Sequence, residues 1–282
     1  MRVTAAGAFG RPTEAAMASA KIATDRAKGL AAIAFFGVVA IAGATLTRAW
    51  ESALGVARPA DSGQGSFDGP ISFEPNKGQA DENVKFVARG PGYVVYVTEK
   101  GTLLSLGPEV EHADAANRGS LAINFVGTVT HLQPVALRPV PASSSYLSGR
   151  DQTKWITGIP NFAQVQFHDV YSGIDVICHG THGSLGYDFK VEPGADASVI
   201  ALEIQGARRV QLTPGGELSI RTTRAELRLK RPFAYQEIGG SKHTIAVRYV
   251  VNNRRVRFVL GDYDPRKALT IDPVLSYVKY LR

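Results

Sequence analysis

The sequence predicts an all-β protein, an antiparallel β-sandwich-like domain preceded by one N-terminal hydrophobic helix. From Ile71 onward, apolar and polar residues alternate with period two, as in half-buried strands, and no helical periodicity stands out. Gly, Pro and Asn interrupt these runs roughly every 8–12 residues, which is typical of the turns in an antiparallel sandwich or barrel. Before the strands, residues 29–46 contain no charged side chain, which indicates an apolar helix.

The apolar run belongs to a segment, residues 1–46, that has the layout of a secretory signal. Lys21, Arg26 and Lys28 precede the run, and Ala42-Gly43-Ala44 offers a small-residue cleavage site. The run is also long enough to cross a bilayer, so a cleaved signal peptide and a transmembrane anchor both stay open. Because the positive charge precedes the run, either one predicts that the rest of the chain is exported. Its location is then periplasmic, cell-surface or secreted, or membrane-anchored if residues 29–46 are not cleaved.

Residues 47–70 predict a flexible linker, because they are rich in small and polar residues and lack an apolar period. The β-rich domain is expected over residues 71–275. Three hairpins are predicted in it by alternating runs that flank turn residues. Their turns lie at Glu99-Lys100-Gly101, Pro214-Gly215-Gly216 and Asn252-Asn253. Residues 195–199 predict a single helical turn.

Composition limits the function classes. The chain has 282 residues, 44% of them hydrophobic, which suffices for a core and argues against global disorder. A single Cys excludes an internal disulfide framework. The net charge of +7 suggests an anionic partner. However, the densest basic cluster, residues 221–231, alternates along strands with few aromatic residues nearby, which favours a solvated sheet face and no nucleic-acid partner.

Two carboxylates are candidate catalytic residues. Asp175 and Asp188 each lie inside an apolar stretch, and strands that paired across a turn near Gly183 would place both on one face. Two carboxyl groups roughly 5–10 Å apart are what a glycoside hydrolase needs. Structural hydrogen bonding is the favoured interpretation, because nothing else in the sequence marks a sugar cleft. No G-x-S-x-G, G-x-G-x-x-G or Walker motif occurs.

The most metal-like stretch is Cys178-His179-Gly180-Thr181-His182. A thiolate and two imidazoles could supply three ligands for zinc through Cys178, His179 and His182. No second Cys/His cluster follows, so a strand that ends in a small buried Cys178 is favoured over a metal site. The sequence therefore predicts no cofactor.

A series of strings resembles the N-terminal domain of bacterial SBBP-type β-propeller repeat proteins. The strings span about residues 71–277, and the longest are FEPNKGQA at 73–80, VKFVARG at 84–90, WITGIP at 155–160, VYSGID at 170–175, YDFKVEPGAD at 187–196 and IDPVLSY at 271–277. The resemblance implies an export signal before the domain and propeller repeats after it. Residues 276–282 would then be a vestige of the lead-in to those repeats. It implies no catalytic residues.

The expected function is therefore a non-catalytic exported structural or interaction module of a bacterial cell-envelope or extracellular protein, which binds a glycan or another surface partner. The alternative is a carbohydrate-active hydrolase that uses Asp175 and Asp188. Expected partners are a cell-surface polymer or a propeller domain encoded downstream, together with the membrane if the N-terminal helix is uncleaved.

Overall fold

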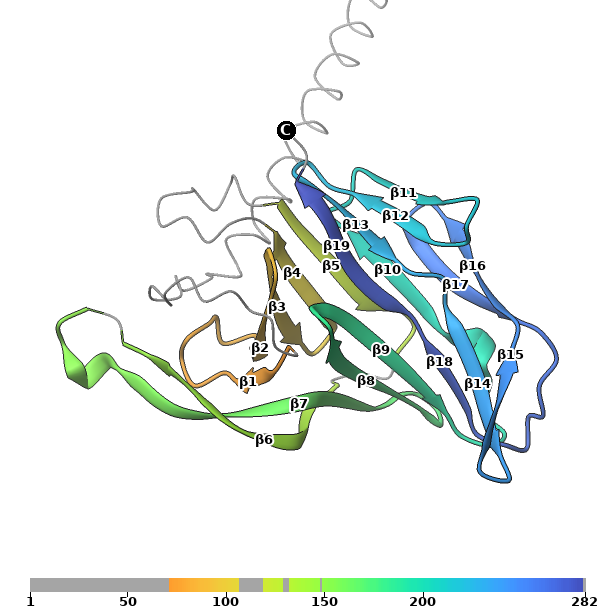
Figure 1. Cartoon of the computed structure of the whole chain (residues 1–282), viewed down its shortest axis with the longest axis horizontal. Coiled ribbons are helices and arrows are strands. Elements are labelled where there is room, and N and C mark those ends of the chain that lie inside the picture. The colour runs from red at the N-terminus through yellow and green to blue at the C-terminus, as the bar shows by residue number, and fades with distance from the viewer. Residues whose placement is uncertain (1–70, 107–118, 129–131, 148, 281–282) are drawn as a thin grey trace, which may run out of the picture. The chain divides into compact units, whose positions relative to one another are not determined.

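The computed structural model of the protein describes residues 71–106, 119–128, 132–147 and 149–280 (Figure 1). The expected N-terminal helix, the linker and the last two residues lie outside this part of the chain. No helix among the described residues is both long enough and apolar enough to span a membrane.

The first part of the body consists of five short strands. They are β1 (Phe73–Pro75), β2 (Val84–Gly90), β3 (Tyr93–Thr98), β4 (Gly101–Leu106) and β5 (Gly119–Phe125). The predicted hairpin around Gly101 is confirmed as β3–β4, with Thr98 paired to Gly101. Glycine is required there because its φ is +139° and an added Cβ would lie 2.2 Å from the Ile123 carbonyl oxygen.

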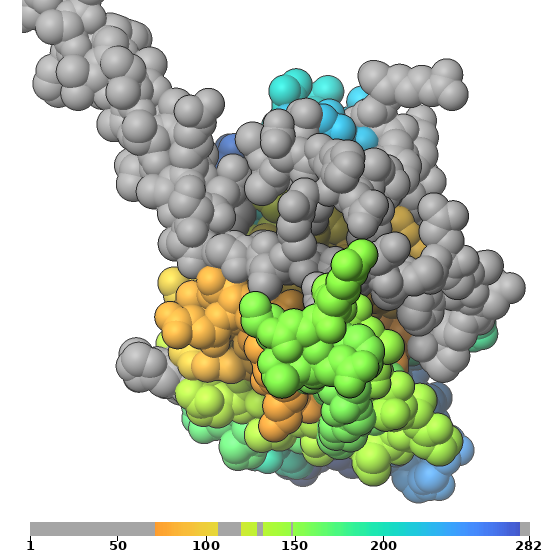
Figure 2. Space-filling model, turned by 90° about the vertical axis from the view of Figure 1, so that its left-hand side faces the viewer, coloured from red at the N-terminus to blue at the C-terminus, as the bar shows by residue number. Residues whose placement is uncertain are grey.

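The central strands are longer. They are β6 (Val135–Tyr146), β7 (Ile156–Tyr171), β8 (Ile174–Thr181) and β9 (Ser184–Val191), with a 3₁₀ turn, η2 (Gln152–Lys154), between β6 and β7. Strands β6 and β7 form a hairpin whose far end projects from the body (Figure 1). Toward its loop end, where Tyr146 pairs with Ile156, Tyr146 donates a hydrogen bond to the Glu74 carboxylate, which also pairs with Arg89. Figure 2 shows this contact region, where the green hairpin lies against orange residues of β1 and β2.

The last part of the chain contains ten strands after a 3₁₀ turn, η3 (Ala197–Val199), which lies where one helical turn was predicted. The strands are β10 (Ala201–Gln205), β11 (Arg209–Leu212), β12 (Leu218–Arg221), β13 (Ala225–Leu229), β14 (Phe233–Ile238), β15 (Ser241–Ile245), β16 (Val247–Asn252), β17 (Arg255–Leu260), β18 (Leu269–Asp272) and β19 (Val274–Tyr280). The hairpins β11–β12 and β16–β17 confirm the other two predictions. The β16–β17 turn uses Asn253 at a φ of 55°, which Asn tolerates.

The all-β, antiparallel prediction is confirmed, since the pairings found among the described strands are antiparallel. These strands do not form two separate sheets as in a sandwich. They join in a single hydrogen-bonded sheet that curls into a nearly closed, barrel-like body. The sheet comes close to closure where β11 lies beside β16. Strand β19 continues to Tyr280 and pairs with β13, so the domain boundary expected at residue 275 falls inside a strand.

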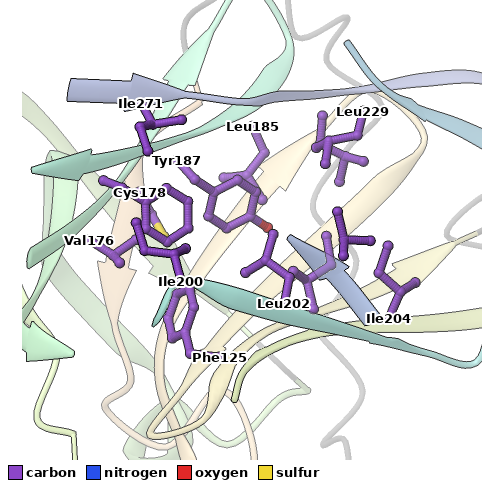
Figure 3. Close-up of a cluster of buried hydrophobic side chains, with 14 of the residues drawn as sticks. Phe125, Val176, Cys178, Leu185, Tyr187, Ile200, Leu202, Ile204, Leu229 and Ile271 are labelled. Carbon is purple, nitrogen blue, oxygen red and sulfur yellow. The ribbon is translucent and has the colours of Figure 1, made fainter. Parts of the chain in front are cut away.

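The curled sheet encloses a core of aliphatic and aromatic side chains (Figure 3). Phe125 meets Phe167 edge to face with 5.2 Å between ring centroids, and Phe189 meets Phe258 at 5.5 Å. A polar link lies within this interior, where the hydroxyl groups of Tyr187 in β9 and Thr102 in β4 are 2.7 Å apart. Both residues are almost completely buried, so each hydroxyl has exchanged water for the other.

This buried hydroxyl pair yields a test of the core. Tyr187→Phe should lower the free energy of unfolding by about 1–3 kcal/mol, because the Thr102 hydroxyl is left buried without its partner. The double variant Tyr187→Phe/Thr102→Val should recover part of that loss, because replacing both partners leaves neither group unsatisfied. Urea titration of the three proteins measures the effect. Losses that simply add in the double variant would contradict a coupled pair.

Candidate functional site

Five neighbouring strands, β8, β9, β18, β14 and β15, present one face to the core and the other to solvent. One row across these strands consists of Asp175, Lys190, Thr270, Tyr235 and Thr244, each the register partner of the next. Side chains opposite one another in a sheet share a face, so the whole row lies outside. The candidate site is on this face and is called the outer-face patch. It comprises His179, Asp188, Lys190, Phe233, Tyr235, Lys242 and Asp272.

Asp188 is the best-connected carboxylate of the outer-face patch. Lys190 Nζ lies 3.0 Å from Asp188 Oδ2, and His179 Nε2 lies 3.4 Å from Asp188 Oδ1. Burial acts to raise the pKa of Asp188, but the hydrogen bonds and charges of His179 and Lys190 outweigh it, so this pKa is lowered from its usual value. Asp188 is therefore an anion at neutral pH.

The pKa of Asp272 is shifted in the opposite direction. It ends β18, beside the Asp188 region of β9, with Ile271 paired to Phe189. Burial first, and then the negative charge of Asp188, raise the pKa of Asp272 above its usual value. Its Oδ1 atom is buried and has no hydrogen-bond partner among the described residues. The patch thus holds two neighbouring carboxylates, one well satisfied and one not.

His179 is held in place by its neighbours on β8 and β9. Its Nδ1 atom lies 3.1 Å from the Thr181 hydroxyl. Its ring covers Gly186, its register partner, where an added Cβ would lie 2.3 Å from His179 Cε1. The glycine therefore makes the room in which the imidazole lies flat on the sheet, with Nε2 toward Asp188.

The aromatic part of the patch lies on β14 and β15. Phe233 is 44% exposed although it is a large apolar side chain, and its register partner is Asp272. Its ring centroid is 5.7 Å from that of Tyr235, and Lys242 Nζ lies 4.0 Å above the Tyr235 ring. The patch consequently combines an accessible aromatic surface with charged groups of both signs.

Asp175 and Asp188 share the outer face as the sequence predicted, because β8 and β9 pair across the turn at Gly183. Each has its own partners. Asp175 accepts hydrogen bonds from Gln166 Nε2, from the Asp169 backbone N–H and from His168 Nδ1. These contacts tie the end of β7 to β8, where the β7 register shifts. They match the structural bonding that the sequence favoured for Asp175, whereas the hydrolase role stays a prediction.

The structure does not bring Cys178, His179 and His182 together. Adjacent residues of a strand point to opposite faces, so Cys178 lies in the core (Figure 3). His179 therefore lies on the outer face, where it contacts Asp188. Burial raises the pKa of the Cys178 thiol, which keeps it in the neutral form that binds metals poorly. His182 lies in the β8–β9 turn at a φ of 45°.

Sequence reasoning missed Asp272 and gave no special place to Phe233 and Tyr235. Asp272 lies more than eighty residues after Asp188 and reaches it only through the pairing of β18 with β9. The one local signal is a lone Asp between Ile271 and a proline that ends the strand. Phe233 directly follows a proline, Pro232, and belongs to no recognisable sequence motif.

A hollow of about 540 Å³ lies elsewhere, near the loop after β1, and it is lined by residues that include Asn76, Lys85 and Pro134. The loop itself is held by Asn76, whose Nδ2 group donates to the carbonyl oxygens of Ala80, Asp81 and Val84. These hydrogen bonds explain the residues NKGQ at 76–79 as loop-forming residues. None of the candidate residues of the outer-face patch lines the hollow.

Comparison with protein-family models gives a match over residues 73–274 to a family described as "Domain of unknown function (DUF7948)". The matched range covers the strands from β1 to the start of β19. No curated protein and no solved structure matches the chain.

The contact between His179 and Gly186 yields a test of the site's geometry. Gly186→Ala should lower the free energy of unfolding by about 1–3 kcal/mol, because its Cβ would overlap the imidazole. In a His179→Ala background the same change should cost little, since the overlapping ring is gone. Thermal or urea unfolding of the four proteins completes the cycle. An equal cost of Gly186→Ala in both backgrounds would show that the ring does not lie there.

Proposed function

The chain belongs to the DUF7948 family, and we propose that it is a non-catalytic, exported interaction module that binds a glycan of the bacterial cell envelope or extracellular space. The single observation that carries this proposal is the exposed Phe233 ring beside Tyr235, in register with Asp272. An isolated exposed apolar residue is ordinary on a protein surface. This one lies next to another ring and to polar hydrogen-bonding groups.

That combination suits a sugar. A pyranose ring has an apolar C–H face that packs on an aromatic ring, and its edge carries hydroxyl groups that need donors and acceptors. Phe233 and Tyr235 offer the apolar surface, while Asp188, Asp272 and Lys190 offer charged hydrogen-bonding groups on the same face. Hydrogen bonds to charged groups are stronger than those between neutral groups. A few such contacts around an aromatic platform orient a ligand without requiring a deep pocket.

The remaining parts of the proposal come from the sequence. Residues 1–46 supply the export signal or anchor, and residues 47–70 tether the body at a distance from the membrane or the cleavage site. Attachment to propeller repeats, as the SBBP resemblance implies, would place the patch on a larger surface protein. Both points stay predictions.

Glycan binding is tested by applying the purified chain to an array of bacterial cell-wall and capsular oligosaccharides. Phe233→Ala and Tyr235→Ala should each weaken binding roughly five- to tenfold, since losing part of an aromatic contact costs about 1 kcal/mol. Leu212→Ala is the matched control, because Leu212 is 50% exposed on β11, outside the patch. Binding that is absent, or that falls equally in the control, contradicts the proposal.

Export is tested by replacing Val38 and Val39 with Arg in the middle of the apolar run. Each Arg at the centre of such a segment disfavours membrane insertion by about 2.5–3.5 kcal/mol, so the variant should remain in the cytoplasmic fraction. Replacing the same residues with Leu should leave export intact. Cell fractionation and protease accessibility of intact cells measure the outcome. Export of the Arg variant would show that this segment is not the export signal.

A further inference from the structure

Three potential metal ligands on the outer face come from three adjacent strands. They are His179 on β8, Asp188 on β9 and Asp272 on β18. Each one follows a core residue in the chain, and these core residues, Cys178, Tyr187 and Ile271, lie together in the buried cluster (Figure 3). Packing of the three core residues fixes the strands, and strand alternation then directs the three donors to the same part of the outer face.

The spacing of the donors suits a metal ion. One ligand atom from each residue lies within 4.8 Å of the others, and His179, Asp188 and Asp272 form the one such group of His, Cys, Asp and Glu among the described residues. The His179 Nε2 and Asp188 Oδ1 atoms are 3.4 Å apart. Two ligands with bonds of about 2.1 Å to a tetrahedral ion are separated by about 3.4 Å. Small side-chain adjustments therefore close the site around an ion.

The imidazole is oriented for this purpose. If Nδ1 carries the proton, it donates to the Thr181 hydroxyl at 3.1 Å, and the Nε2 lone pair faces the carboxylates. Metal-bound histidines are commonly oriented by a hydrogen bond at the second ring nitrogen. The flat position of the ring over Gly186 restricts it further. The position of the ring requires glycine at residue 186, because any side chain there would overlap it.

An independent observation points to a missing positive charge. The Oδ1 atom of Asp272 is buried and has no donor among the described residues, whereas most buried carboxylate oxygens have one. The neighbouring Asp188 adds a second negative charge, and Lys190 is bonded to the other oxygen of Asp188, Oδ2. A cation bound by both carboxylates would compensate the poorly solvated charge of Asp272 and remove the repulsion between the anions.

We propose that His179, Asp188 and Asp272 bind a divalent transition-metal cation, with Zn²⁺ as the best fit, on the outer face of β8, β9 and β18. One imidazole and two carboxylates suit zinc better than magnesium or calcium, which prefer oxygen ligands alone. Three protein ligands leave a fourth position open. The side chains of His179 and Asp188 are 18% and 19% exposed, so that position faces solvent. The zinc site shares Asp188 and Asp272 with the proposed glycan site and lies beside Phe233, but its test needs no glycan.

Zinc binding is measured on the untagged full chain by isothermal titration calorimetry with ZnCl₂ after treatment with a chelator. One equivalent of Zn²⁺ is expected, and the melting temperature should rise with the zinc concentration. His179→Gln and Asp272→Asn should each weaken binding at least tenfold, since each removes one of three ligands. Lys190→Gln should strengthen binding, because the ammonium group lies 3.0 Å from a ligand carboxylate and repels the ion.

Asp175→Asn is the matched control, because Asp175 is a carboxylate on the same face that is bonded to Gln166 and lies outside the group of three ligands. It should bind zinc like the unaltered chain. Circular dichroism and thermal melting in a chelator show whether each variant folds. If a ligand variant does not fold, Lys190→Gln still tests the site, because it keeps all three ligands. Co²⁺ substitution should give a spectrum without a thiolate charge-transfer band, since Cys178 is in the core.

The proposal fails if zinc does not bind stoichiometrically, if Asp175→Asn weakens binding as much as Asp272→Asn, or if Lys190→Gln leaves the affinity unchanged. A thiolate band in the Co²⁺ spectrum would place the metal at Cys178 and would overturn it as well. Because the readouts use metal alone, failure of glycan binding on the array has no effect on them.

Discussion

The structure depends on one constraint, the period-two alternation of strands in a sheet that curls around its own interior. Inward positions have little access to water, so most of them are aliphatic or aromatic, as Phe125, Phe189 and Phe258 are. Polar chemistry is therefore displaced to the outward positions of the same strands. Cys178 and His179 show the consequence within two residues, since one is fully buried and the other faces solvent.

Strand pairing decides which outward residues become neighbours. Strand β9 pairs with β8 on one edge and with β18 followed by β19 on the other. The break between β18 and β19 falls at Pro273, which has no N–H to donate, while its carbonyl accepts from the Tyr187 N–H. Asp272 is thus placed at the end of a strand, beside Asp188 and in register with Phe233. The carboxylates, the imidazole and the aromatic pair meet there because three segments far apart in the chain, the β8–β9 hairpin, β14 and β18, pair side by side.

Much of the local structure could be predicted from the sequence, because its causes are local. Gly101 and Asn253 mark their hairpins by the backbone conformations that they allow, and the shared face of Asp175 and Asp188 follows from a single turn. The single curled sheet and the position of Asp272 could not be predicted. They depend on pairings between strands far apart in the chain, such as β18 with β9 and β10 with β5, which leave no mark on either partner alone. For the same reason the sequence grouped His179 with Cys178 and His182, its neighbours in the chain, rather than with its neighbours in space.

The separation of the two faces also separates stability from binding. Cys178, Tyr187 and Ile271 supply buried area to the core, and their chain neighbours on the outer face supply little. Substitutions at His179, Asp188 and Asp272 can therefore change what the surface binds while the strands keep their packing. Asp272 goes further, since a buried oxygen without a donor and a raised pKa both disfavour its ionised form in the folded chain. A charge that costs stability in this way suits a role in ligand binding, and the position of Asp272 between Asp188 and Phe233 agrees with the proposed cation site.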